Sequence, residues 1–79
     1  MPTAYFLLNV VLNQETEIIE KIKKILEEES VEYQVQGVFG IYDIIVKITA
    51  ESDDRLRHII LEKIKPIDKI QSAITVMVA

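Results

Sequence analysis

Both glycines of this chain lie in one short segment, Gly37-Val38-Phe39-Gly40-Ile41-Tyr42-Asp43, and a tyrosine and an aspartate follow closely after the second glycine. Glycine lets the backbone take a positive φ or lets another group approach it closely. In such a turn the backbone exposes N–H and C=O groups, Asp43 can accept a hydrogen bond from an ammonium group, and Tyr42 adds a ring with a polar tip. These groups complement an amino acid zwitterion. The alternative is that Tyr42 and Asp43 only fix the turn, with Asp43 bonded to local backbone groups.

Other residues that could do chemistry are few. His58 has no Ser or acidic partner in a recognisable catalytic motif, so we interpret it as a solvated helix residue. Asp53 and Asp54 are typical of a helix start and not of a metal pair. The segment Val35-Gln36-Gly37-Val38-Phe39 resembles the acylphosphatase signature, but it continues to Gly40 where that signature has a phosphate-binding arginine. We therefore predict no catalytic residue, no metal site and no cofactor.

The composition limits the classes of protein to consider. Seventy-nine residues form one domain, 1–79, whose small core is marginal alone, and without cysteine no disulfide can stabilise it. Self-association is the remaining way to bury more surface. The net charge of −4 disfavours binding to nucleic acid phosphates. Without a spanning apolar run of about 20 residues or a signal peptide, we expect a soluble, cytoplasmic protein. Abundant Ile, Lys and Glu are typical of thermophiles.

The first half of the chain predicts a strand, a helix and another strand. Residues 4–13 are apolar at nearly every position and rich in strand-forming residues, which indicates a buried strand. Asn13 is a candidate N-cap for an amphipathic helix that should end near Ser30. Its apolar stripe consists of Ile18, Ile19, Ile22, Ile25 and Leu26.

The second half predicts the remaining elements. Strands at 31–38 and 41–49 are so close in sequence that a tight antiparallel hairpin should join them, with Phe39-Gly40 as its turn. Ser52 should cap a second helix that ends at Lys65-Pro66, and a last strand should run from residue 70 to the end of the chain. The order β-α-β-β-α-β predicts an α+β, ferredoxin-like fold with a four-stranded antiparallel sheet and two helices on one face.

The face of the sheet that the helices leave open should be polar in a monomer, but it is not. The first and last strands are largely apolar on both alternating faces. In the last strand, alternation places Ile70, Ile74, Val76 and Val78 on one face and Ala73 and Met77 on the other. An exposed apolar face of that size is uncommon on a soluble monomer, so we predict a dimer whose sheets pack face to face in a dimeric α/β-barrel-like assembly. Strand alternation also places Tyr42 and Asp43 on opposite faces, so at least one of them faces a neighbouring subunit.

Three segments give the chain a resemblance to a known family. Ala4-Tyr5-Phe6-Leu7-Leu8-Asn9-Val10 resembles its first strand, Gly40-Ile41-Tyr42-Asp43 its Gly-x-Tyr-Asp hairpin motif, and Ser72-Ala73-Ile74-Thr75 the start of its last strand. Together with the length and the element order, they make the chain similar to the stand-alone ligand-binding domains of Lrp/AsnC transcription regulators, called RAM domains.

The resemblance implies a non-enzymatic module that binds an amino acid effector and assembles from dimers into octameric or decameric rings, with or without full-length Lrp/AsnC regulators. The effector would lie between dimers. The implied effector-binding residues are Gly40, Tyr42, Asp43, Ser72 and Thr75. Ala73 stands where many relatives carry a hydroxyl, so one polar contact with the effector is missing. No helix-turn-helix precedes the first strand, so operator DNA binding is not expected.

Two other functions are open at this point. One is a small dimeric α/β-barrel enzyme that acts on a small organic substrate, with His58 or Asp43 as its base. The other is a purely structural oligomer.

Overall fold

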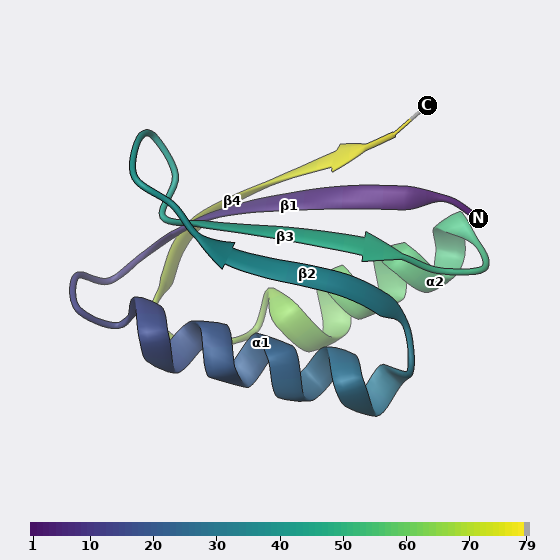
Figure 1. The fold of residues 1–79 in the computed structure, drawn as a ribbon, viewed down its shortest axis with the longest axis horizontal. Coiled ribbons are helices and arrows are strands. Elements are labelled where there is room, and N and C mark those ends of the chain that lie inside the picture. Colours follow the sequence, from purple (N-terminus) through teal and green to yellow (C-terminus); the bar gives the residue numbers. More distant parts are fainter. Residues whose placement is uncertain (79) are drawn as a thin grey trace.

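The computed structural model describes residues 1–78 and contains one antiparallel sheet whose helices all lie on one side (Figure 1). The elements are β1 (Thr3–Val10), α1 (Glu15–Glu29), β2 (Glu32–Gly37), β3 (Ile44–Thr49), α2 (Asp53–His58), η1 (Ile59–Ile64) and β4 (Ile70–Met77). The strand order across the sheet is β2-β3-β1-β4. The predicted βαββαβ ferredoxin-like fold is confirmed, and the end of the predicted last strand at residue 79 lies outside the described residues.

The first helix has the predicted buried stripe and end, but a different start. Of the five stripe residues, Ile18, Ile22 and Leu26 are buried and Ile19 and Ile25 are partly buried. The chain leaves the helix at Ser30 with a φ of 58°. The predicted N-cap was wrong, because Asn13 has a φ of 68° and the cap position falls on Gln14, whose side chain makes no capping hydrogen bond. A left-handed residue after β1 turns the chain towards the helix, which Asn tolerates better than most residues.

The second helical segment begins at the predicted cap and changes its geometry midway. Ser52 Oγ accepts a hydrogen bond from the Arg55 backbone N–H at 3.1 Å. After α2 the chain continues into η1, a π-helix, and the Lys65 N–H bonds to the Ile60 carbonyl five residues back at 2.8 Å. The predicted end at Lys65-Pro66 is confirmed. The wider π-helical turns were not predicted from the apolar spacing.

The core lies between the helices and the face of the sheet that they cover. Every buried residue among those described is apolar. From the sheet the core takes Ala4, Phe6, Leu8, Val10, Ile44, Val46, Ile48 and Ala50, and from the helices Ile18, Ile22, Leu26, Leu56, Ile59, Ile60 and Ile64. Alternate residues of β1 and β3 contribute, which is the period of a strand with one covered face.

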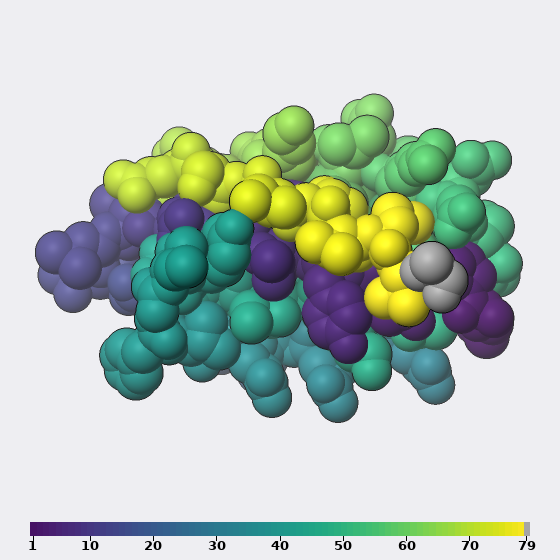
Figure 2. Space-filling model, turned by 90° about the horizontal axis from the view of Figure 1, so that it is seen from above, coloured from purple at the N-terminus to yellow at the C-terminus, as the bar shows by residue number. Residues whose placement is uncertain are grey.

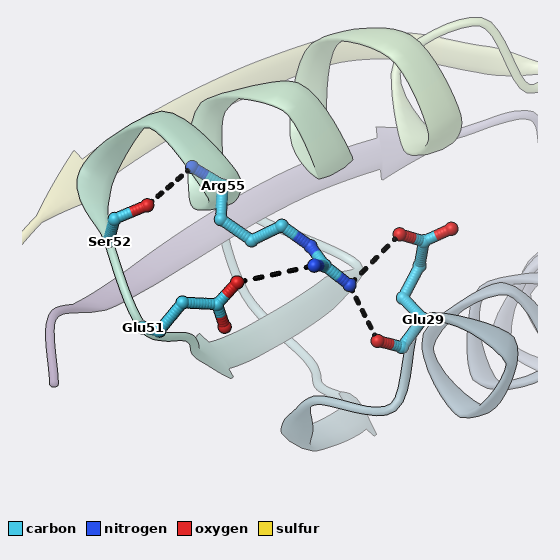
Figure 3. Close-up of polar contacts among 4 residues, drawn as sticks. All are labelled: Glu29, Glu51, Ser52 and Arg55. Atoms are coloured by element: carbon cyan, nitrogen blue, oxygen red, sulfur yellow. Dashed lines mark hydrogen bonds and ion pairs between the residues drawn. The ribbon is translucent and has the colours of Figure 1, made fainter.

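Hydrogen bonds and ion pairs at the end of α1 hold the helical layer together (Figure 3). The last turn of α1 contains no basic residue, and the three carboxylates of residues 27–29 lie at the negative end of the helix dipole. Arg55 compensates from α2: its Nη2 donates to the Glu29 carbonyl at 2.7 Å and lies 3.4 Å from Glu29 Oε1, while Nη1 donates to Glu51 Oε1 at 3.2 Å. One guanidinium thus joins the two helices.

A further contact ties α1 to the edge strand β2. The Tyr33 hydroxyl donates to Glu27 Oε1 at 2.8 Å. This hydrogen bond, followed by partial desolvation and the nearby negative charge, raises the pKa of the Tyr33 phenol above its usual value. Tyr33 therefore stays protonated and remains a donor throughout the physiological pH range.

Arg55→Ala should lower the free energy of unfolding by about 1–2 kcal/mol, because it removes charge-assisted hydrogen bonds to the α1 end from a partly exposed side chain. Urea unfolding followed by circular dichroism measures this change. Lys63→Ala, at an exposed position of η1, is the matched control and should cost much less. Equal losses for the two variants would contradict the role of Arg55.

Candidate functional site

The loop between β2 and β3 is longer than predicted and projects away from the helices. The predicted tight hairpin with a Phe39-Gly40 turn was wrong, because β2 ends at Gly37 and β3 begins at Ile44, which leaves residues 38–43 as a loop. The loop is closed by a hydrogen bond from the Val38 N–H to the Asp43 carbonyl at 2.9 Å. It rises on the side of the sheet opposite to the helices (Figure 1) and stands over one end of the open face (Figure 2).

Glycine is needed at position 40 for its backbone conformation. Gly40 has a φ of 145°, which residues with a side chain rarely adopt. A Cβ built there would meet nothing within 4 Å, so space is not the constraint. Gly40 therefore shapes the loop and leaves an open surface beside it.

Asp43 anchors the loop to β1. Its backbone N–H donates to the Leu8 carbonyl at 2.9 Å, and its carboxylate Oδ2 accepts from the Val10 N–H at 3.0 Å. The side chain thus takes the place of a strand carbonyl where the pairing of β1 with β3 ends. This bond reaches across the sheet and not only within the turn. A carboxylate has a second oxygen, so Oδ1 can still accept from a ligand.

Asn9 and Ser72 lie at the same end of the sheet. Asn9 directly precedes Val10, whose N–H bonds to Asp43. Asn9 also pairs with Ser72 between β1 and β4, and its Nδ2 donates to Ser72 Oγ at 3.1 Å. Sequence reasoning did not select Asn9 as a site residue. The signal was present, because Asn9 interrupts an otherwise apolar strand. Asp43, Asn9 and Ser72 together form what we call the polar end of the sheet.

The two hydroxyl residues predicted for the site lie on opposite faces of the sheet. Ser72 pairs with Asn9 on the open face, whereas Thr75 pairs with Phe6, whose side chain is buried under the helices. One chain therefore cannot present both hydroxyls on one face. Gly40, Tyr42 and Asp43 all lie in the loop. Of Ser72 and Thr75, only Ser72 lies at the end of the sheet where the loop is.

An irregularity in β4 corrects the predicted alternation of that strand. Sequence reasoning grouped Ile70 with Ile74 and Val76 on one face. The pairing with β1 shifts between Asn9 and Val10, so Ile70 pairs with Val10 and packs against the core. A bulge adds one residue and reverses the face of everything before it.

The centre of the open face is apolar and half-exposed. Ile45, Leu7 and Ile74 form a row across β3, β1 and β4, and Ile74 and Val76 are 47% and 45% exposed. The edge strand β2 ends this apolar area, since its side chains on the same face are Glu32, Gln34 and Gln36. Figure 2 shows β4 and β1 running along this face beside the loop.

The remaining candidates lie elsewhere. His58 is exposed at the end of α2. Within residues 1–78, no three His, Cys, Asp or Glu side chains are grouped so that they could hold a metal ion. None of the helices described is both long and apolar enough to cross a membrane.

The fold and the site define a small α+β domain with an uncovered apolar sheet face and a polar end. A family model described as the Lrp/AsnC ligand binding domain matches residues 3–79. The chain therefore belongs to the Lrp/AsnC ligand-binding domain family.

Solved structures agree with this assignment. FFRP-DM1 is 32% identical, with 100% of both chains covered and a TM-score of 0.83. The hypothetical protein PHS023 from Pyrococcus horikoshii is 32% identical, with 100% of this chain and 90% of that chain covered and a TM-score of 0.82. The transcriptional regulator NMB0573 from Neisseria meningitidis, solved with L-Met, shares the fold at 13% identity, with 99% and 49% covered and a TM-score of 0.72. Comparison with curated protein sequences gives no match.

Two variants separate the structural role of Asp43 from its charge. Asp43→Ala removes the acceptor for the Val10 N–H and should lower the free energy of unfolding by about 1–2 kcal/mol. Asp43→Asn keeps an oxygen that can accept this bond and should lose clearly less. Thermal unfolding of both variants measures the difference. Equal destabilisation would mean that the charge, and not the hydrogen bond, holds the loop.

Proposed function

We propose that residues 1–79 act as a single, non-enzymatic domain that binds a free amino acid and couples this binding to self-assembly. The observation that carries the proposal is the polar end, where a carboxylate, an amide and a hydroxyl gather beside an exposed loop that contains Gly40. Family membership and the neighbour solved with L-Met support the amino acid as the class of ligand.

The groups at the polar end match the two charges of an amino acid. Asp43 Oδ1 can accept from the ammonium group while Oδ2 stays on Val10. Ser72 Oγ accepts from Asn9, which leaves its own hydroxyl proton free to donate to a carboxylate. Backbone N–H groups beside Gly40 are further donors. A micromolar to millimolar dissociation constant needs only about 4–8 kcal/mol, which a few such contacts provide.

The site is open on one side, so a second copy would complete it. The apolar row of the open face requires cover, and a face-to-face dimer would supply it. The loop that carries Gly40 and Tyr42 would then meet the neighbouring subunit. Thr75, on the other face, would reach the same ligand only from a further copy, as in the octameric or decameric ring that we propose.

In this proposal the domain senses an amino acid in the cytoplasm and changes the assembly of a regulator when the amino acid binds. Full-length Lrp/AsnC regulators are candidate partners. The net charge of −4 makes the domain itself a poor binder of DNA phosphates. Coupling follows if the complete site exists only in the assembled state, since binding then favours assembly and assembly favours binding.

A thermal-shift screen of the twenty amino acids tests the ligand class. At 100 times its dissociation constant, a true effector should add about 2.7 kcal/mol of apparent stability per site. Asp43→Asn should abolish this shift because the charge that pairs with the ammonium is lost, and Ser72→Ala should reduce it. No shift with any amino acid for the unmodified chain would refute the proposal.

Light scattering on Ile45→Lys tests the role of the open face. Placing a charge in the apolar row should prevent burial of that face and leave a folded monomer, because an unpaired charge is costly to desolvate. The matched control is Gln36→Lys, which adds the same charge to the neighbouring position on β2 and should leave the mass unchanged. A monomeric unmodified chain, or an Ile45→Lys variant of unchanged mass, would contradict the face-to-face dimer.

A further inference from the structure

The tip of the 38–43 loop carries two large apolar side chains in full contact with solvent. Phe39 is 107% exposed and Ile41 is 84% exposed. Phe39 therefore contributes almost nothing to the stability of its own chain. A benzyl side chain at the end of a projecting loop has a large apolar area to bury on a partner, about 150–250 Å².

A cleft of matching character lies between η1 and β4. Its volume is about 260 Å³, and the lining residues are Arg57, Ile60, Leu61, Thr75 and Met77. The lining is mainly apolar, with a guanidinium and a thioether among its groups. Pockets for drug-sized ligands have about 300–1,000 Å³, so this cleft suits a single side chain better than such a ligand.

The loop and the cleft lie at opposite ends of the molecule. Asp43, at the base of the loop, contacts Val10 at the end of β1, whereas Met77 in the cleft pairs with Ala4 near its start. Six strand residues span about 20 Å, and Figure 1 shows the loop and the C-terminal end of β4 far apart. A chain therefore cannot fill its own cleft with its own loop.

We propose that Phe39 of one copy of this chain inserts into the η1–β4 cleft of a second copy. The positive Arg57 guanidinium complements the negative face of the aromatic ring, and the Met77 sulfur makes a favourable contact with the ring edge. Ile41 packs beside them against Leu61, which is 51% exposed. In a head-to-tail arrangement this contact leaves a free loop and a free cleft at the two ends of each pair.

The size of this contact determines its role. A stable protein–protein interface buries about 1,200–2,000 Å² of accessible surface. Two loop side chains in one small cleft bury far less. The contact therefore adds to a larger interface such as the open sheet face. Head-to-tail contacts form closed rings or open filaments, so this contact links copies beyond the face-to-face dimer. The inference deepens the assembly part of the proposed function but requires no amino acid.

Disulfide cross-linking tests the contact directly, because the chain contains no cysteine of its own. Ile41→Cys and Leu61→Cys, a pair that leaves Phe39 in place, are prepared as separate proteins, mixed at equal concentration and oxidised. A contact brings the two Cα atoms close to the distance of about 7 Å that a disulfide tolerates. The expected product is a mixed dimer of the two variants, seen on a non-reducing gel and identified by mass spectrometry.

The control replaces Ile41→Cys by Leu12→Cys, a cysteine at another exposed position, 78% exposed, which should cross-link far less. Phe39→Ala should also lower the mass of assemblies larger than the dimer, with unchanged circular dichroism. Dimers of Ile41→Cys with itself in preference to the mixed product, or equal cross-linking by Leu12→Cys, would overturn the contact. Because none of these measurements uses an amino acid, failure here is distinct from a failed thermal-shift screen.

Discussion

Within residues 1–78 only one face of the four-stranded sheet is covered, because the helical layer reaches only that face. Ile18, Ile22 and Leu26 of α1, with the apolar residues of α2 and η1, cover most of one side and leave a cleft beside β4. On the other side Leu7, Ile45 and Ile74 form an apolar row that nothing in residues 1–78 covers. This imbalance is the constraint from which the proposed assembly and the position of the proposed site both follow.

Asp43 connects the loop to this open face. One carboxylate oxygen holds the Val10 N–H, so the residue positions the loop beside the polar end of Asn9 and Ser72. The other oxygen can accept from a ligand. The same side chain thus anchors the loop and, in our proposal, binds the ligand, so ligand binding can change the position of the loop. Through the exposed Phe39 at the loop tip, such a change would also affect the proposed contact with a neighbouring copy.

Prediction succeeded where the signal was local in the chain. The apolar stripe of α1, the Ser52 cap and the end of the second helix follow from side-chain periodicity and from capping chemistry within a few residues. It failed at the tight hairpin, at the Asn13 cap and at the face of Ile70. In each case a short irregular stretch changed the direction of the chain, and in the last a bulge reversed the strand alternation.

The sequence by itself determined the order of the elements, the covered face and the apolar character of the open face, because these depend on periodic patterns within single segments. The family motif also marked Gly40, Tyr42 and Asp43 from the sequence alone. Only the tertiary structure showed that Asn9 and Ser72 join Asp43 at one end of the sheet, and that Thr75 points to the other face. The physical reason is strand register: which residues meet across neighbouring strands depends on loop length and on a bulge, and neither can be read from one segment.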